Sequence, residues 1–415
     1  MWRELPLGSL AAINSGGTPS TENAEFWGGD IPWVTPTDIT ACKTNYLFDT
    51  TSQITKKGLH SCSAKLLPAG SILFTSRATV GVSRIAGIPV CTNQGFKSLT
   101  PGASADGKFL FYQVQRLRSA FQRYAAGSTF PEINKKDTAR VLIPHPADVR
   151  VQQKIATILS TIDTAIEQTE ALIEKYQHIK AGLMHDLFTR GVLPTGQLRP
   201  PREQAPELYQ ETAIGWIPRE WQTGQIGIYF EIQLGKMLNQ LAKTGKNAFP
   251  YLGNRSVQWN RLEMASLDSM DFSLEEQKKF ALKDGDLLVC EGGEVGRTSI
   301  WESQMENCFY QKAIHRLRGK HEGIKPRFML WYMHFAQANG QFADFTSQSS
   351  IAHLTQEKLA KVPALLPPTP EQELIVSRID AHETVIDGER DYLANLRAQK
   401  LGLMQDLLTG KVSVQ

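Results

Sequence analysis

The five cysteines are the first side chains of this 415-residue chain that could bind a metal ion or form cross-links. Zinc sites commonly use cysteines two to four residues apart, and a disulfide framework needs an even number of them. The chain has no Cys-x-x-Cys pair, and five is odd. We therefore expect reduced cytoplasmic thiols, and neither a metal centre nor disulfides, at Cys42, Cys62, Cys91, Cys290 and Cys308.

Glycine-rich stretches could hold phosphates, but none has the spacing that this chemistry needs. Gly245-Lys246 lacks the earlier glycine of a GxxxxGK[ST] phosphate loop. The CEGGEVG stretch, from Cys290 to Gly296, does not follow the strand–loop–helix fingerprint of a dinucleotide site. We predict a tight turn there.

Catalytic motifs are also missing from the sequence. Neither His-x-x-x-His nor GxSxG occurs, so isolated histidines such as His60, His315 and His353 are expected on the surface or in the core. A DNA amino-methyltransferase needs an Asn/Asp-Pro-Pro-aromatic motif, and Leu366-Pro-Pro-Thr369 has neither the amide nor the aromatic ring. These absences favour binding without catalysis.

Charge is unevenly distributed along the chain, whose net charge is +3. Residues 1–150 hold 16 Lys and Arg against 10 Asp and Glu, and residues 221–369 hold 17 against 15. Residues 151–220 hold 7 against 9, and residues 370–415 hold 5 against 8. Two basic regions alternating with acidic ones suit a polyanionic partner, although such an excess also occurs in proteins that never bind nucleic acid.

The elements that must position any binding residues begin with a repeated segment. Residues 151–192 and 371–412 align without a gap at an offset of 220, with 12 of 42 pairs identical. Apolar residues recur at three- and four-residue steps in both copies, from Val151 through Ile158 and Ile179 to Leu183 in the first. The pattern predicts two long helices, each about 60 Å if continuous, that pair as an antiparallel coiled coil.

The regions before the two helices repeat as well. Leu67–Gly81 matches Leu282–Gly296, with a turn glycine, an apolar strand and a second turn in both, and Trp2 corresponds to Trp221. Short apolar runs between Gly, Pro and Thr predict strands, and Lys108–Tyr124 is predicted to be a helix. Each region is therefore expected to be a mixed α/β domain.

The fold class that these patterns predict is α+β, with two pseudo-repeated domains separated by two long antiparallel coiled-coil helices. A proline-rich linker joins the halves. We expect the following division: domain 1 at 1–147, the first helix at 148–191, the linker at 192–216, domain 2 at 217–368 and the second helix at 369–412.

No signal peptide or membrane span is expected. The first thirty residues lack a signal-peptide pattern, and no apolar run approaches the roughly 20 residues that cross a bilayer. The sequence therefore predicts a cytoplasmic protein.

Together, these motifs resemble the specificity subunit of type I restriction-modification enzymes over the full length of the chain. The motifs are Gly-Trp-Ile-Pro-x-x-Trp at Gly215–Trp221, the glutamine near the start of each repeated helix, Gly-Leu-Met-x-Asp-Leu-x-Thr at both helix ends, and Gly127-Ser-Thr. The first motif is degenerate in the N-terminal copy, where only Trp2 remains.

The resemblance implies a subunit that recognises DNA without catalysing a reaction. Each domain would be a target recognition domain that reads one half of a bipartite site, and the helices would fix the gap between the halves. Two methyltransferase subunits would dock on the helices, and restriction/translocase subunits would join them. S-adenosylmethionine, ATP and Mg would then act on the partner subunits.

The resemblance also implies DNA-binding residues on loops. Arg is suited to guanine and Asn or Gln to adenine, while Lys and Arg contact phosphates. Because the two domains differ in sequence, the target should be asymmetric. The DNA-binding candidates are Arg77, Thr79, Asn93, Gln94, Lys97, Ser128, Thr129, Lys135 and Lys136 in domain 1, and Asn254, Arg255, Arg261, Arg297, Gln311, Lys312, Ser349 and Ser350 in domain 2.

Apolar residues near the helix tips are expected to contact another subunit. These candidates are Leu183, Leu187, Phe188, Leu403, Leu407 and Leu408. Two alternatives to this interpretation stay open: the recognition subunit of a fused restriction-methylation system, and a two-domain scaffold that does not bind DNA.

Overall fold

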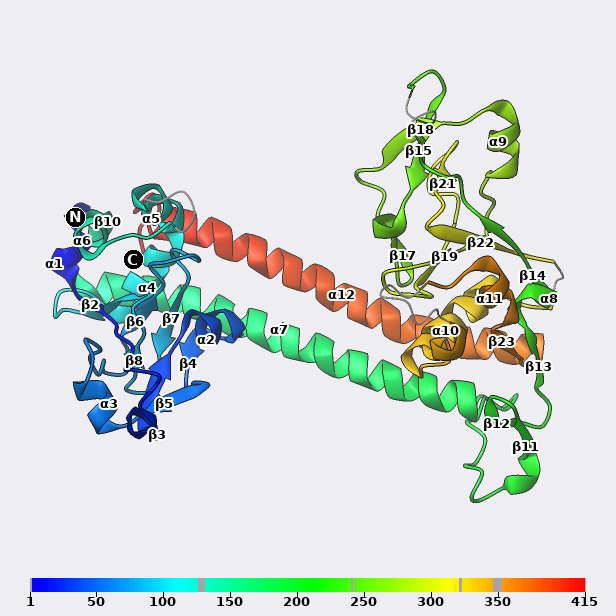
Figure 1. Cartoon of the computed structure of the whole chain (residues 1–415), viewed down its shortest axis with the longest axis horizontal. Coiled ribbons are helices and arrows are strands. Elements are labelled where there is room, and N and C mark those ends of the chain that lie inside the picture. Colours follow the sequence, from blue (N-terminus) through cyan, green and yellow to red (C-terminus); the bar gives the residue numbers. More distant parts are fainter. Residues whose placement is uncertain are drawn as a thin grey trace. The chain divides into compact units, whose positions relative to one another are not determined.

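The computed structural model describes residues 2–125, 131–239, 242, 244–320, 323–345 and 353–414. Contacts divide the chain into two compact units (Figure 1). Unit 1 comprises Met1–Ile173 and Glu389–Gln415, and unit 2 comprises Glu174–Gly388. Each unit therefore contains one globular domain together with part of both long helices.

The globular part of unit 1 alternates short strands with short helices. Its elements are β1 (Trp2–Pro6), α1 (Leu7–Leu10), β2 (Ala11–Ser15), η1 (Ala24–Phe26), β3 (Trp27–Val34), α2 (Pro36–Ala41), β4 (Tyr46–Leu47), β5 (Ser52–Ile54), α3 (Lys56–His60), β6 (Ile72–Phe74), β7 (Ser83–Ala86), β8 (Cys91–Thr92), β9 (Lys97–Pro101), α4 (Gly107–Arg116), α5 (Arg118–Tyr124), α6 (Lys135–Arg140) and β10 (Leu142–Pro146).

The described strands of unit 1 form three sheets. Their orders are β2-β9-β6-β7-β4, β5-β3-β8 and β1-β10. The central strand β6 is buried along its whole length because both of its faces pack in the core. Gly70 precedes this strand at a φ of 87°, a backbone conformation that favours glycine.

The globular elements of unit 2 begin inside the predicted linker at 192–216. Its elements are η2 (Pro206–Leu208), β11 (Tyr209–Thr212), β12 (Gly215–Pro218), β13 (Gln222–Gln225), α8 (Ile226–Tyr229), β14 (Phe230–Leu234), β15 (Ala248–Leu252), η4 (Asn254–Ser256), β16 (Val257–Gln258), β17 (Arg261–Leu262), β18 (Asp268–Asp271), α9 (Leu274–Lys279), β19 (Leu287–Cys290), β20 (Thr298–Ile300), β21 (Phe309–Tyr310), β22 (Ile314–Gly319), α10 (Pro326–Ala338), η5 (Ala343–Phe345), α11 (Gln356–Lys361) and β23 (Pro363–Leu366).

The sheet orders of unit 1 recur in unit 2. Among the described residues, β14-β22-β19-β20 corresponds to β2-β9-β6-β7, β18-β15-β21 to β5-β3-β8, and β13-β23 to β1-β10. Gly285 precedes β19 at a φ of 81°, as Gly70 precedes β6. The predicted mixed α+β class and the repetition of the domain are both confirmed.

The two long helices are α7 (Val149–Thr189) and α12 (Thr369–Leu407). A buried glutamine near the start of each one binds the backbone of the preceding domain. Gln152 accepts a hydrogen bond from the Asp106 N–H at 2.7 Å and donates to the Pro146 carbonyl at 3.0 Å. Gln372 makes the same pair of bonds with Lys325 and Pro367, at 3.0 and 2.9 Å.

The helices run antiparallel within each unit. In unit 1 Lys400 pairs with Asp163 at 2.6 Å and Arg397 pairs with Glu170 at 2.7 Å, so one residue number rises as the other falls. In unit 2 Lys180 pairs with Glu383 at 2.6 Å. The Val192 N–H, just past the end of α7, donates to Glu371 at the start of α12 at 2.7 Å, so the pairing is antiparallel in unit 2 as well.

The buried stripe of α7 differs from the predicted seam. Ile158 and Ile179 are 36% and 42% exposed, whereas Leu159 and Ile173 are buried. The stripe turns because α7 packs on the globular parts of the units as well as on α12, and buried Lys180 occupies one of its positions.

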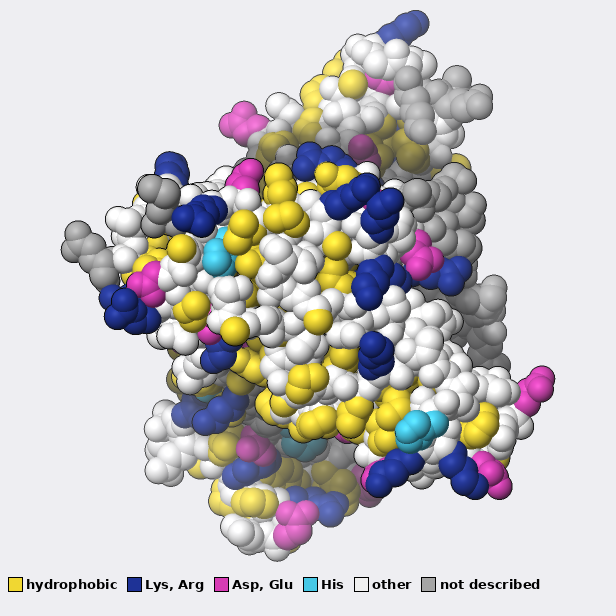
Figure 2. Space-filling view, turned by 90° about the vertical axis from the view of Figure 1, so that its left-hand side faces the viewer, with side chains coloured by type: hydrophobic (Ala, Val, Ile, Leu, Met, Phe, Trp, Pro, Cys, Tyr) yellow, Lys and Arg dark blue, Asp and Glu magenta, His cyan; other side chains and the backbone are white. Residues whose placement is uncertain are grey.

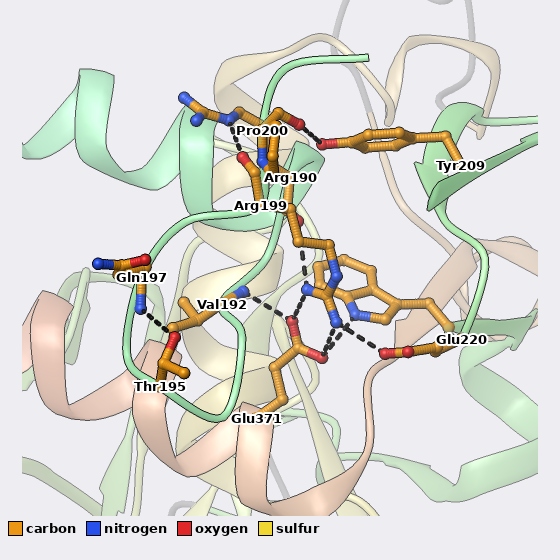
Figure 3. Close-up of polar contacts among 10 residues, drawn as sticks. Arg190, Val192, Thr195, Gln197, Arg199, Pro200, Tyr209, Glu220 and Glu371 are labelled. Carbon is orange, nitrogen blue, oxygen red and sulfur yellow. Dashed lines mark hydrogen bonds and ion pairs between the residues drawn. The ribbon is translucent and has the colours of Figure 1, made fainter. Parts of the chain in front are cut away.

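The linker is fixed to the start of α12 by a buried ion pair (Figure 3). Arg199, 3% exposed, pairs with Glu371 through both guanidinium nitrogens, one of them at 3.0 Å. Glu371 also accepts hydrogen bonds from the Val192 N–H at 2.7 Å and from the Trp221 indole at 3.0 Å. The predicted linker is therefore held to the start of α12 at Arg199.

The predicted helix from Lys108 to Tyr124 is divided into α4 and α5. The break falls at Leu117, whose N–H bonds to the carbonyls of Gln113 and Gln115. Gln113 is fully buried and donates to the carbonyls of Pro144 and Leu408, so α4 holds both β10 and the end of α12.

Among the helices that the structure describes, none combines the length and apolar character needed to cross a bilayer.

Candidate nucleic-acid interface

Three loop segments of unit 1 meet at Ser76, directly after the central strand β6. The Ser76 N–H donates to the Gly95 carbonyl at 2.8 Å, and the Ser76 carbonyl accepts from the Ile133 N–H at 3.0 Å. The turn after Ser76 closes with a hydrogen bond from the Gly81 N–H to Thr75, where Gly81 has a φ of 90°. These contacts bring candidates from three separate stretches of sequence onto one surface.

The candidates of unit 1 differ in exposure. Gln94, Lys135 and Lys136 are exposed together with Arg77, whereas Thr79 and Asn93 are half-buried. Asn93 accepts a hydrogen bond from the Gly95 N–H at 2.9 Å and so shapes its own loop.

Lys97 does not fit its predicted role. Its side chain is buried, and its ammonium lies 3.3 Å from the Ser76 hydroxyl and 3.6 Å from a Glu132 carboxylate oxygen. Lys97 therefore holds two of the segments together and cannot reach a phosphate from this position.

We call this set of three segments, joined by the hydrogen bonds of Ser76 to Gly95 and Ile133, the three-segment frame. Unit 2 contains the same frame, centred on Glu291, which directly follows β19. The Glu291 N–H donates to the Ala313 carbonyl at 2.9 Å, and its carbonyl accepts from the Leu354 N–H at 2.8 Å. The turn closes through the Gly296 N–H to Cys290 at 3.1 Å, with Gly296 at a φ of 81°. The predicted tight turn in CEGGEVG is confirmed.

Arg255, Arg261 and Lys312 are the exposed candidates of unit 2. Arg261 pairs with Glu263 at 2.5 Å. Gln311 is half-buried, and its N–H donates to Leu252 at 3.1 Å.

Asn254 and Arg297 bind each other. The guanidinium of Arg297 donates to the backbone and side-chain oxygens of Asn254 at 2.7 and 2.8 Å, and the Asn254 amide donates to Gly292 at 2.8 Å. Both side chains are thus used to hold the turn against η4. Their predicted contact with a base would require these hydrogen bonds to break.

Four candidates, Ser128, Thr129, Ser349 and Ser350, lie outside the described residues.

Sequence reasoning missed a fourth loop, which lies beside the three segments of unit 1. Gly17 donates its N–H to the Thr92 carbonyl at 2.9 Å, and the Thr18 hydroxyl donates to the side chain of Gln94. A Cβ on Gly16 would lie 1.9 Å from the Asn93 carbonyl oxygen, so the close approach requires glycine. The available signal in the sequence was the Gly16-Gly17-Thr18 string.

A stacked aromatic pair, Trp259 and His334, contacts the turn of the unit 2 frame through Glu294. Trp259 stacks on His334 with ring centroids 4.4 Å apart, and its indole donates to Glu294 at 2.6 Å. Burial, aided by the positive charge of Lys180, lowers the pKa of His334 from 6.5 to about 4. The ring is therefore neutral at physiological pH.

Four of the six residues expected to contact another subunit are instead buried within this chain. Leu187, Phe188, Leu407 and Leu408 are at most 5% exposed. Phe188 packs against Phe335 with ring centroids 5.0 Å apart, because the end of α7 enters the core of unit 2. Leu407 and Leu408 enter the core of unit 1 in the same way, while Leu183 and Leu403 are half-buried.

Positive side chains are spread over the face of unit 1 that points left in Figure 1. Lys and Arg occur across this face, and Asp and Glu lie mainly toward its edge (Figure 2). Within the described part of the chain, no three His, Cys, Asp or Glu side chains lie close enough to hold a metal ion.

Known proteins match this chain in both sequence and fold. The family profile for the type I restriction modification DNA specificity domain matches residues 1–176 and 218–397. The chain therefore belongs to the family of type I restriction-modification specificity subunits.

Individual relatives agree with the profile. The type I restriction enzyme MjaIX specificity subunit of Methanocaldococcus jannaschii is 30% identical over 286 residues, which are 68% of this chain and 62% of that protein. The chain thus spans less than two thirds of that relative. The EcoR124I/EcoR124II specificity subunit of Escherichia coli is 31% identical over 166 residues, 38% of this chain and 40% of that one.

Two solved structures share the fold. The S subunit of a type I system from M. genitalium has a TM-score of 0.57 at 16% identity and covers 98% of this chain and 96% of its own. A chain from a study of complex assembly and conformational transition of the type I R-M system has a TM-score of 0.56 at 17% identity, over 99% and 98% of the two chains.

Proposed function

We propose that this chain is the subunit that gives a type I restriction-modification enzyme its DNA sequence specificity, by reading a bipartite and asymmetric site. One observation carries the proposal: the same three-segment frame occurs in both units, and each copy presents different exposed side chains. Gln94 and Lys136 are exposed in unit 1, whereas in unit 2 Lys312 is exposed on the frame and Arg255 is exposed on η4, which Arg297 ties to the frame through Asn254. Equivalent frames with different side chains suit two half-sites of different sequence.

Base recognition and phosphate contact are assigned to different side chains. The amide of Gln94 can pair with an adenine edge, and the guanidinium of Arg255 with a guanine edge. Lys135, Lys136 and Lys312 carry compact positive charges that suit phosphates, which fix the register of the protein on the duplex.

Methyl transfer and cleavage belong, in this proposal, to partner subunits. Two methyltransferase subunits dock on the helices, and restriction/translocase subunits join through them. S-adenosylmethionine, ATP and Mg act in those partners, in keeping with the absence of cofactor motifs from this sequence.

A DNA-binding titration at several salt concentrations tests the proposal. Phosphate contacts predict that the logarithm of the affinity falls linearly with the logarithm of the salt concentration, with a slope of about −0.9 for each phosphate neutralised. Weak binding without salt dependence would favour the scaffold alternative. Binding of S-adenosylmethionine by the purified chain would favour the fused restriction-methylation alternative.

A further inference from the structure

Two ion pairs occupy equivalent places in the two units: Lys180–Glu383 is buried, and Lys400–Asp163 is largely buried, with the Lys400 side chain 21% exposed. Lys180 on α7 pairs with Glu383 on α12 in unit 2, and Lys400 on α12 pairs with Asp163 on α7 in unit 1, both at 2.6 Å. Lys180 and Lys400 are related by the offset of 220 residues, as are Asp163 and Glu383. The duplication has therefore kept one lysine–carboxylate pair in both copies.

Each lysine also contacts an aromatic ring from the globular part of its unit. The Lys180 ammonium lies 5.0 Å from the centroid of Trp331 on α10, and the Lys400 ammonium lies 5.8 Å from the centroid of Tyr112 on α4. Both rings are at most 2% exposed. The lysine is thus the point at which two long helices and a domain helix meet.

The polar atom of each ring binds a carboxylate of the helix pair. The Tyr112 hydroxyl donates to Asp163 at 2.6 Å, and the Trp331 indole donates to Asp380 at 2.8 Å. Asp380 stands three residues before Glu383 and therefore on the same side of α12. In both units the domain helix is tied to the cation and to an anion of the helix pair.

A buried ion pair is a poor way to gain stability, because desolvation offsets most of the attraction. Apolar residues of similar volume would pair the helices at least as well. The charged arrangement instead orients the domain helix. The ammonium is attracted both to the carboxylate of the helix pair and to the ring face of the domain helix, which favours the rotational setting that brings the three groups together.

We propose that each of these lysine–carboxylate–aromatic junctions fixes the rotation of its domain about the helix pair of the same unit, and thereby selects the length of the spacer between the two half-sites. The inference rests on the proposed function. Successive base pairs are rotated by about 34°, since B-DNA has about 10.5 base pairs per turn. A domain free to rotate by such an angle would accept spacers that differ by one base pair.

The test compares DNA selected from a library in which half-sites and spacer length both vary. The full chain is used in complex with the methyltransferase subunits that copurify with it. In Lys180→Glu/Glu383→Lys the ion pair is restored, but the ammonium now comes from α12 and no longer from α7, so the geometry of its contact with Trp331 changes. In Lys180→Met/Glu383→Met both charges are removed without leaving one of them buried alone.

Both variants are expected to keep the wild-type half-site bases and to lose discrimination between adjacent spacer lengths by roughly tenfold. The matched control is Arg397→Met/Glu170→Met, which removes an exposed ion pair between the same helices that does not involve a domain ring. The control should keep the wild-type spacer.

Wild-type spacer selection in both junction variants would overturn the inference, and so would a change in the half-site bases. If one of the two variants does not fold, the spacer selection of the other is the test. The equivalent Lys400→Met/Asp163→Met variant in unit 1 should also lose spacer discrimination, and wild-type selection by it would contradict the inference. A wild-type complex that selects no bipartite site would instead refute the proposed function.

Discussion

Lys136, in the first turn of α6, and Gln94, on the loop after β8, are both exposed in unit 1 but differ in what they can contact. Lys136→Ala should weaken binding to all DNA sequences alike and reduce the slope of log affinity against log salt by about 1. Gln94→Ala should cost about 1–3 kcal/mol against the preferred site only, because it removes a base contact. Competition titrations with specific and random duplexes measure both effects.

The matched control for these variants is Arg150→Ala. Arg150 is exposed at the start of α7, outside the three segments, and is paired with Asp148. Equal losses for Arg150→Ala and Lys136→Ala would contradict the phosphate contact assigned to Lys136.

His334 makes the stability of unit 2 depend on pH. Its pKa is about 4 in the folded protein and 6.5 in the unfolded chain, so the unfolded chain binds the proton more tightly. Stability is therefore fully present above pH 6.5 and is lost as the pH falls toward 4, by about 3 kcal/mol at most for this group.

Denaturation of His334→Phe isolates this effect. Phenylalanine keeps the stack on Trp259 and cannot be protonated, so the variant should lose less stability than the wild type between pH 6.5 and 4. Identical pH profiles would show that His334 does not carry the dependence. His315, whose pKa is also lowered by burial, titrates in both proteins and cancels in the comparison.

The sequence marks polar residues on loops, but it does not say which of them face solvent. Lys97 and Lys136 are both cations in candidate loops, yet only Lys97 meets a carboxylate, from Glu132. That contact joins residues 35 positions apart, and local patterns contain no information about it. Asn254 and Arg297 likewise bind each other although they stand 43 positions apart in the sequence.

At the scale of elements, Gln152 fixes the start of α7 to the globular part of unit 1. Gln152→Leu would leave the Asp106 N–H and the carbonyls of Ser104 and Pro146 without this partner. Three hydrogen bonds at about 1 kcal/mol each predict a loss of roughly 3 kcal/mol. Gln153→Leu is the control. The Gln153 side chain is exposed, so this substitution should change the free energy of unfolding by less than about 0.5 kcal/mol.

Urea denaturation followed by tryptophan fluorescence compares the two glutamine variants. Equal unfolding midpoints would contradict the anchoring role of Gln152.

The linker should depend on its buried ion pair. Arg199→Met leaves Glu371 charged and buried, which typically costs about 3–5 kcal/mol. The double variant Arg199→Met/Glu371→Met removes both charges and should recover most of that loss. Limited proteolysis should cut the linker fastest in the single variant. Protection equal to wild type in Arg199→Met would contradict the anchoring role.

The sequence predicts the positions of helices and turns well where the apolar period is strong. It does not predict which residues are buried where contacts between elements determine burial. The two long helices and the turn glycines Gly70 and Gly285 follow from local pattern. The exposure of Ile158 and the burial of Phe188 do not, because the apolar stripe of α7 faces α12 along one part and a domain core along another. A helical period identifies a buried face but not the element that covers it.

At the scale of the whole molecule, the duplication explains why one chain carries two globular domains with the same three-segment arrangement. The sheet orders, the glutamine anchors and the lysine–carboxylate pairs all recur at nearly constant sequence offsets. Under the proposed function, the different exposed side chains of the two units would read two different half-sites. The bases themselves do not follow from the fold, since they depend on contacts that form only with DNA.

Sequencing of DNA selected by the assembled complex from a random library tests the central claim most directly. The account predicts two short, different motifs separated by a gap of fixed length and unspecified sequence. Substituting the exposed residues of unit 1 should change one motif and leave the other and the gap unchanged. A single continuous motif, or a change in both halves after substitutions in unit 1 alone, would contradict the account.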